Sequence, residues 1–143
     1  MTTVRGADDV IRALKRHNED VDKALGNILL AAASVVAEAI EAKAPGDIRD
    51  DIVIDEPQRQ KKRMVVAVGP SDEKWYARFL EFGTRGHQVA ASVAKALKID
   101  SDTFRKQVTV SGVNAAPFMR PAADESEQKA LAAAGSELGK LLR

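Results

Sequence analysis

Residues 8–46, DDVIRALKRHNEDVDKALGNILLAAASVVAEAIEAKAPG, decide how the rest of the chain can fold. Apolar side chains recur in this stretch at alternating spacings of four and three, which places them on one face of a helix. They are Val21, Leu25, Ile28, Ala32, Val35 and Ala39. The proline-glycine pair at 45–46 ends the pattern, because proline disfavours helix in the residue before it. One helix over about 8–44 would be roughly 50 Å long, so we expect part of it to project beyond the core or to pack on a neighbouring subunit; two shorter helices, broken near His17 or Gly26, are the alternative.

Two short strands are expected after this helix. Ile48, Ile52 and Ile54 alternate with polar residues, which is the period-two pattern of a half-buried strand. Residues 64–68, MVVAV, form a second β-rich run, and the polar stretch 56–63 between the two predicts a hairpin with a basic loop. That loop is either a solvated turn or a contact with nucleic acid or an acidic partner.

The next predicted element is a short helix over 71–82, capped by Ser71 or Asp72 and ended by Gly83 in a left-handed conformation. It contains four of the six aromatic side chains of the protein, Trp75, Tyr76, Phe79 and Phe82. Three of them share one face at spacings of four and three. Such a patch serves either as a core anchor or as an assembly interface.

The C-terminal half is less regular. We expect a small alanine-rich helix over 89–97, a strand over 107–110, and an extended segment that enters a last helix with Pro121 at its first position. The apolar stripe predicted for that helix comprises Leu131, Ala134, Leu138 and Leu141.

Composition excludes several kinds of site. The 143 residues include no cysteine and only two histidines, so disulfides, thiolate metal sites, a cysteine nucleophile and a site of several imidazoles are excluded. No apolar run approaches the roughly 18–20 residues that span a bilayer, and the N-terminal segment lacks the apolar region of a signal peptide. We therefore expect a soluble protein that is not exported.

Charge is unevenly distributed along the chain. The net charge is +1, with −5 over residues 1–58 and +6 over residues 59–143. A weak overall charge argues against a dedicated nucleic-acid binder. The opposite net charges of the two parts of the chain are equally consistent with head-to-tail self-association.

Residue patterns that carry catalysis are missing from the sequence. His87 has no second imidazole or cysteine at metal-ligand spacing, and Glu81 is the only acid between Lys74 and Lys98, so that stretch has no carboxylate pair. The aspartates at 47, 50 and 51 lack the spacing of an EF-hand loop. We expect no catalytic, cofactor-binding or metal-binding residue.

Two segments together carry a family resemblance. WYARFLEFGT at 75–84 and APFMRPA at 116–122, preceded by an alanine-proline segment at 44–49, resemble the gene-ten-like family of head–tail joining, or tail completion, proteins of long-tailed phages of the lambdoid HK type. This chain departs from the family pattern in two places. The threonine-glycine-x-leucine that usually follows alanine-proline is missing, and about thirty residues separate Thr84 from Pro117, which indicates an enlarged loop or hairpin at 86–114.

The resemblance implies a single α+β domain over residues 1–143, in which a long N-terminal and a C-terminal helix pack on a small, mainly antiparallel sheet with a short aromatic helix between strands. It implies a structural virion protein without catalysis or cofactor, made in the bacterial host cytoplasm and located in the neck or tail. Its expected partners are its own copies in a ring, with a hexamer favoured, and tail-tube and head-connector proteins. DNA would pass through the lumen without sequence recognition, and no membrane is involved. A small nucleic-acid-binding module that uses its basic loops is the alternative.

Two sets of residues are singled out, the first by the resemblance and the second by the net charge of +4 over residues 85–120. The first is the structural motif: Tyr76, Phe79, Glu81, Phe82, Gly83, Thr84, Pro117, Phe118, Arg120 and Pro121. We hypothesise that Glu81 pairs with the Arg120 guanidinium, that Gly83 supplies a positive φ, and that Phe118 packs on Tyr76 and Phe79 while Pro117 and Pro121 fix its approach. The second set, on the enlarged loop, consists of candidate partner or lumen contacts, the alternative being an insertion on the outer wall: Arg85, His87, Lys95, Lys98, Arg105 and Lys106.

Overall fold

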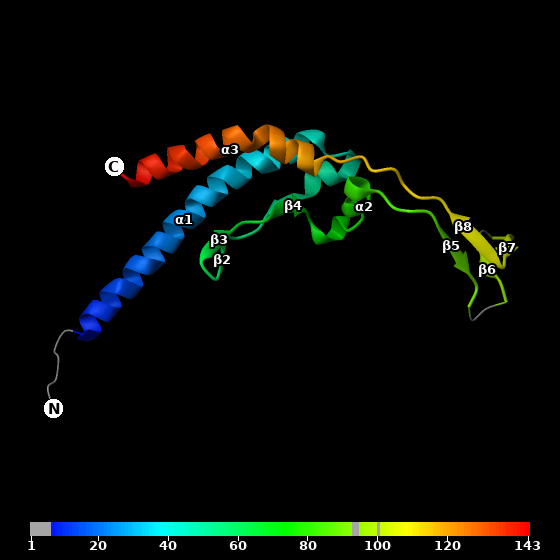
Figure 1. The fold of residues 1–143 in the computed structure, drawn as a ribbon, viewed down its shortest axis with the longest axis horizontal. Helices are drawn as coiled ribbons and strands as arrows, with labels where there is room; N and C mark the ends of the chain where they lie inside the picture. The colour runs from blue at the N-terminus through cyan, green and yellow to red at the C-terminus, as the bar shows by residue number, and fades with distance from the viewer. Residues whose placement is uncertain (1–6, 93–94, 100) are drawn as a thin grey trace, which may run out of the picture.

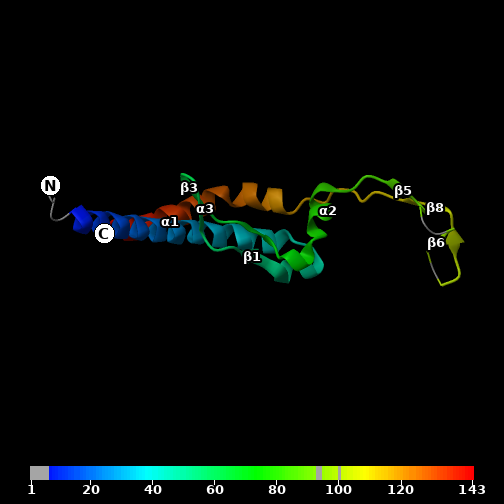
Figure 2. The ribbon, with the colours of Figure 1, turned by 90° about the horizontal axis from the view of Figure 1, so that it is seen from below.

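Two long helices form one end of the molecule and a β-hairpin arm forms the other (Figure 1). The computed structural model describes residues 7–92, 95–99 and 101–143. Helix α1, Ala7–Lys43, runs unbroken for 37 residues, so the prediction of one helix is confirmed and the alternative of two shorter helices is wrong. Helix α3, Met119–Leu141, packs antiparallel on the C-terminal half of α1 (Figures 1 and 2). The predicted α+β architecture is confirmed.

Short antiparallel strand pairs connect the helices. After a 3-10 helix η1, Gly46–Asp51, strand β1, Ile52–Ile54, pairs with β4, Val68–Pro70. The hairpin between them continues as a second pair, β2, Gln58–Gln60, with β3, Arg63–Val65. The prediction of a strand beginning at Ile48 is wrong, because Ile48 lies in η1 and inserts into the core, where it is 1% exposed.

The aromatic segment divides into two short helices. They are η2, Asp72–Lys74, and α2, Ala77–Phe82. Gly83 ends α2 with φ 71°, as predicted. The predicted N-cap is wrong, because no side chain caps η2 and the buried Ser71 hydroxyl has no hydrogen-bond partner.

The arm consists of residues 84–114. Strand β5, His87–Ala90, pairs with β8, Gln107–Val110, and beyond them β6, Leu97–Lys98, pairs with β7, Phe104–Arg105. The strand predicted at 107–110 is confirmed. The alanine-rich helix predicted over 89–97 is wrong where the chain is described, because its ends belong to strands; residues 93–94 and 100 lie outside the description.

The core lies where α1, η1, α2 and the start of α3 meet. Its buried members are Ile40, Ala44, Ile48, Ala77, Phe118 and Ala122. The stripe predicted to bury α3 is wrong, because three of its four residues are exposed: Leu131, Leu138 and Leu141. Small side chains face the core side of α3 instead, namely Ala122, Ser126 and Ala130. Pro121 is the third residue of α3 rather than the first.

Helix α1 contradicts the expectation that no segment of the chain is apolar enough over sufficient length to span a bilayer. Within Asp9–Lys43 an 18-residue window reaches a mean hydropathy of 1.5, so this helix is long and apolar enough to cross a membrane by length and composition alone. Of that window 22% is buried within the protein. Core helices of soluble proteins meet the same criterion, so the property by itself is weak evidence for a membrane span.

Candidate functional site: the capped helix, the groove and the arm

Glu81 joins the aromatic helix to the last helix. Its carboxylate accepts hydrogen bonds from three consecutive backbone N–H groups, those of Phe118 at 2.8 Å, Met119 at 3.0 Å and Arg120 at 3.1 Å. The first N–H groups of a helix have no partner within the helix, and a carboxylate at that end also meets the positive end of the helix dipole. A side chain 38 residues upstream of Met119 therefore supplies the N-terminal cap of α3.

Capping keeps this buried carboxylate charged. Glu81 is 5% exposed, and the loss of water raises its pKa. The three backbone N–H groups and the positive charge of Arg120 stabilise the carboxylate and outweigh the loss of water, so the pKa of Glu81 lies below its ordinary value of 4.5. Glu81 is thus anionic at neutral pH.

The predicted fork between Glu81 and the Arg120 guanidinium is wrong. Among the ion pairs of the described residues none joins these two side chains, and Arg120 offers its backbone N–H instead. The guanidinium carbon lies 4.9 Å from the centre of the Phe82 ring, a cation–π contact on the outer surface. The two motif segments nevertheless meet, because the Glu81 carboxylate accepts the backbone N–H groups at the start of α3 that have no partner within the helix.

Close backbone approach fixes the base of the arm. The N–H of Thr84 donates to Val113 O at 2.8 Å, and the Thr84 hydroxyl accepts from the Val113 N–H at 3.0 Å. A Cβ on Gly83 would lie 2.7 Å from Val113 O and 2.8 Å from the nitrogen of Ala115. The predicted need for glycine is therefore confirmed, for a positive φ and for contact with the returning strand.

Phe118 is buried in the core as expected, but only one of the two aromatic side chains predicted to pack on it belongs to the core. Tyr76 packs against the core cluster that contains Phe118, whereas Phe79 does not belong to it. Phe79 instead meets Trp75 edge-on, with ring centres 5.6 Å apart. The aromatic patch is thus divided between the core and the surface.

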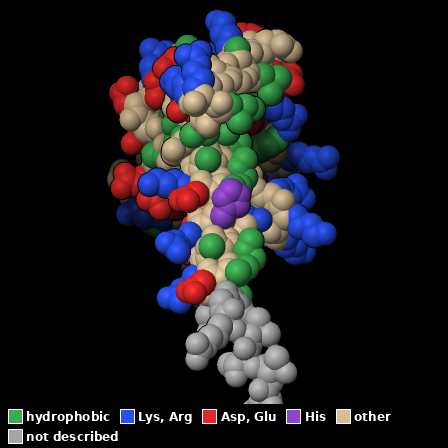
Figure 3. Space-filling model, turned by 90° about the vertical axis from the view of Figure 1, so that its left-hand side faces the viewer, with side chains coloured by type: hydrophobic (Ala, Val, Ile, Leu, Met, Phe, Trp, Pro, Cys, Tyr) green, Lys and Arg blue, Asp and Glu red, His purple; other side chains and the backbone are tan. Residues whose placement is uncertain are grey.

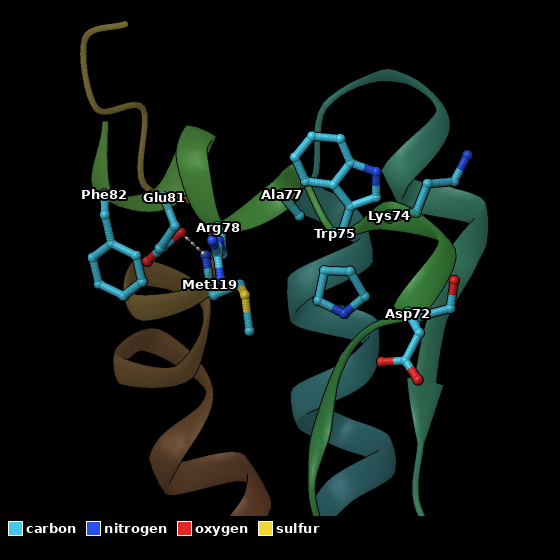
Figure 4. Close-up of a pocket in the computed structure, with 10 residues that line it drawn as sticks. Asp72, Lys74, Trp75, Ala77, Arg78, Glu81, Phe82 and Met119 are labelled. Carbon is cyan, nitrogen blue, oxygen red and sulfur yellow. Dashed lines mark hydrogen bonds between the residues drawn. The ribbon is translucent and has the colours of Figure 1, made fainter. Parts of the chain in front are cut away.

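An apolar groove runs along the surface part of this patch. It has a volume of about 450 Å³, with Phe82 at one end, Arg78 and Met119 next to it, and Trp75 farther along toward Lys74 and Asp72 (Figure 4). Trp75 is 66% exposed and Phe82 is 64% exposed. Large aromatic side chains held open to solvent by a rigid helix are typical of a surface that binds another protein.

A polar network that the sequence did not reveal holds η2 against η1. Asp47 accepts hydrogen bonds from Lys74 at 2.7 Å and from the Tyr76 hydroxyl at 2.8 Å, and Lys74 also pairs with Asp51 at 3.2 Å. The bond from Lys74 lowers the pKa of Asp47, and the two aspartates raise the pKa of Lys74. No spacing in the sequence links positions 27 residues apart, so only the fold could identify this pairing.

The candidate contacts on the arm are all exposed. Arg85, His87, Lys95, Lys98, Arg105 and Lys106 lie on the strands or loops of the arm, far from the helical end of the molecule (Figure 1). The arm also exposes apolar side chains, with Phe104 at 61% and Ile99 at 46%. Across the described ranges, no group of three histidine, aspartate or glutamate side chains is arranged to hold a metal ion.

Exposed aromatic and basic surfaces are typical of a protein that makes contacts with other proteins. The chain belongs to the family described as "Bacteriophage HK97-gp10, putative tail-component", which matches residues 8–83, from α1 to the glycine that ends α2. It is therefore a phage tail component, a structural protein of the virion. No match was found among curated proteins or among solved structures.

Proposed function

We propose that this chain is the neck or tail completion subunit that assembles as a ring at the head–tail interface, joins the tail tube to the head connector and lets DNA pass through its lumen. A hexamer is the favoured ring. The family supplies the tail assignment, and the shape of the subunit supports the rest of the proposal.

The observation that carries the proposal is the exposed area. A compact protein of 15.4 kDa exposes about 7,200 Å², whereas this chain exposes 11404 Å². The nine residues outside the described ranges account for about 1,400 Å² of the difference at most. The remaining excess exceeds the roughly 800 Å² that a subunit buries in each of two standard interfaces. The subunit therefore has the surface that a ring member with further partners requires.

The arm is the second support. Two-stranded hairpins are marginally stable on their own in water, and this one carries exposed apolar and basic side chains together. Binding to an acidic partner surface, or lining a channel for the DNA backbone, would satisfy both features. In this proposal Arg85, His87, Lys95, Lys98, Arg105 and Lys106 are the partner or lumen contacts.

Assembly with purified partners tests the proposal. The chain would be mixed with the tail-tube protein and the head-connector protein of the same phage and examined by negative-stain microscopy and limited proteolysis. We expect closed rings and protection of residues 86–114 when a partner is present. A chain that forms no ring with either partner, and whose arm is cleaved at the same rate throughout, contradicts the proposal.

One observation favours a second candidate, a nucleic-acid-binding module. Lys61, Lys62 and Arg63 at the turn of the β2–β3 hairpin are exposed like the basic residues of the arm, although Arg59 beside them is ion-paired with Asp22. This candidate predicts duplex binding that weakens steeply with salt. A mobility-shift titration in 50 and 200 mM salt distinguishes it, because the ring subunit alone should bind duplex DNA weakly in both.

A further inference from the structure

Two apolar ridges at the helical end are uncovered, and they lie on different helices. The α1 ridge consists of Ile11, Leu14, Val21 and Leu25, which are 48%, 58%, 43% and 41% exposed. The α3 ridge consists of Leu131 and Leu138 of α3 and of Leu142, the residue that follows the helix; they are 60%, 45% and 79% exposed. Figure 3 views this end of the molecule and shows hydrophobic side chains open to solvent among the charged ones.

The α1 ridge continues an interface that already exists within the chain. It has the same alternating spacing of three and four as Val35 and Ala39 further along α1, which line a hollow between α1 and α3 together with Ser126 and Lys129. The face of α1 that packs on a helix in its C-terminal half is thus uncovered in its N-terminal half. The partner suited to such a face is another helix.

Helix α3 of the same chain is too short to cover the α1 ridge. The ion pair of Lys43 with Glu125, at 2.9 Å, sets the level at which the two helices run side by side. From Glu125 to the end of α3 at Leu141 there are 16 residues, which reach only to about Asn27 of the antiparallel α1. At about 1.5 Å per residue, the part of α1 before Asn27 therefore extends about 30 Å beyond the reach of α3. Figure 1 shows that the two helices also diverge toward these ends.

The α3 ridge faces away from α1. The side chains that α3 buries are Ala122, Ser126 and Ala130, roughly on the opposite side of the helix from Leu131 and Leu138. Gly135 and Gly139 border the ridge, and a Cβ on either would meet nothing within 4 Å. Glycine weakens a helix, and here it leaves a shallow surface that a second helix can approach closely.

Building on the ring assembly proposed above, we infer that the α1 ridge of one copy packs on the α3 ridge of its neighbour. Each chain carries one ridge of each kind, and their apolar lengths match at about 21 Å and about 16 Å. A contact between two different surfaces is heterologous, and heterologous contacts close into rings when the rotation permits. A second copy is therefore the occupant, and its contact repeats around the ring.

Engineered cysteines test this contact directly, because the natural chain contains none. Leu14→Cys or Val21→Cys would be mixed under mild oxidation with Leu131→Cys or Leu138→Cys, at a concentration where the wild-type chain is oligomeric. We expect disulfide-linked dimers from at least one mixed pair and none from the α1 variants alone. The control mixes Lys23→Cys with Leu138→Cys and should give none.

Three outcomes overturn the inference. Oligomers that form without any mixed cross-link show that the ridges meet other surfaces, while leaving the ring intact. Cross-linking of Leu14→Cys to itself assigns the α1 ridge to a symmetric pairing of two α1 helices. A wild-type chain that stays monomeric at every concentration, alone and with its partners, contradicts the ring itself and this contact with it.

A paired substitution supplies an independent readout. Leu14→Gln with Leu25→Gln should reduce the oligomer fraction at least tenfold in sedimentation velocity without changing the circular dichroism of the free chain, because both side chains are exposed. Arg16→Gln with Lys23→Gln, on the other side of α1, should leave the oligomer unchanged. Flotation of the wild-type chain with phosphatidylcholine vesicles, lost in the leucine pair, would instead assign the ridge to a lipid surface.

Discussion

At the scale of single residues, the fold depends on groups that satisfy backbone atoms far away in sequence. Glu81 caps α3, Gly83 allows the returning strand of the arm to approach closely, and Thr84 hydrogen-bonds with both the N–H and the carbonyl of Val113 in that strand. The importance of Glu81 and Gly83 was predictable from their motif. The partner of Glu81 could not be predicted in the same way. Opposite charges can be recognised in a sequence, whereas the unpaired backbone N–H groups at the start of a helix cannot.

Removal of the Glu81 cap should destabilise the chain. Glu81→Ala leaves three buried or half-buried N–H groups without a partner, and we expect a loss of about 2–3 kcal/mol in the free energy of unfolding. Glu81→Gln keeps an acceptor but loses the charge, and should cost about 1 kcal/mol. Urea denaturation measures both, with Glu73→Gln as the exposed control; a Glu81→Ala variant as stable as the wild type contradicts the role of the cap.

The pH dependence follows from the lowered pKa of Glu81. A carboxylate whose folded pKa lies below its unfolded value contributes stability that is fully present above about pH 4.5 and is lost as the pH falls through the folded pKa. The difference in unfolding free energy between wild type and Glu81→Gln should therefore shrink between pH 6 and pH 3. A difference that stays constant over this range would show that Glu81 does not act through its charge.

Substitution of Gly83 should be far more damaging than substitution of another glycine. Gly83→Ala forces a Cβ to within 2.7 Å of Val113 O at φ 71°, and we expect a loss of at least about 2 kcal/mol. Gly135→Ala is the matched control, because its Cβ meets open space inside a helix and should stabilise the free chain by up to about 1 kcal/mol. Thermal denaturation of the two variants should give shifts of opposite sign.

At the scale of elements, the predictions succeeded where one periodic pattern governed a long segment. Helix α1 agrees with its predicted range to within one residue at each end, because its apolar spacing is regular and a proline follows it. The α3 stripe was misplaced because the side that packs on α1 uses alanine and serine, whose burial carries little hydropathy signal, while leucines occupy the exposed side. The helix predicted over 89–97 is wrong at its described ends because strand pairing with the returning segment prevails there over the local preference of alanine-rich sequence for helix.

The arm is an element whose removal should leave the rest of the chain folded. Replacement of residues 87–110 by a short glycine-serine linker keeps the bonds between Thr84 and Val113 at its base. We expect the melting temperature to change by no more than a few degrees, because the core cluster contains no arm residue, while assembly with partners is lost. A truncated chain that fails to fold, or one that assembles normally, contradicts this separation of roles.

At the scale of the whole molecule, exposed surface is the dominant feature. The subunit buries a small core and exposes an aromatic groove, two apolar ridges and a basic arm, at sites spread from one end of the molecule to the other (Figures 1 and 2). The sequence predicted the long N-terminal helix and indicated the phage tail-component family to which the chain belongs. The positions of these surfaces relative to one another come only from the fold, because they depend on how α1, α2, α3 and the arm are placed in space, and the groove alone combines distant segments.

The most direct test of the account is a cryo-electron microscopy reconstruction of the head–tail junction of a particle that contains this chain. The account predicts a closed ring of this subunit between the tail tube and the head connector, with helix α1 of each copy lying on α3 of the next. A junction in which the chain is a single copy, or lies outside the path of the DNA and touches no second copy, would contradict it.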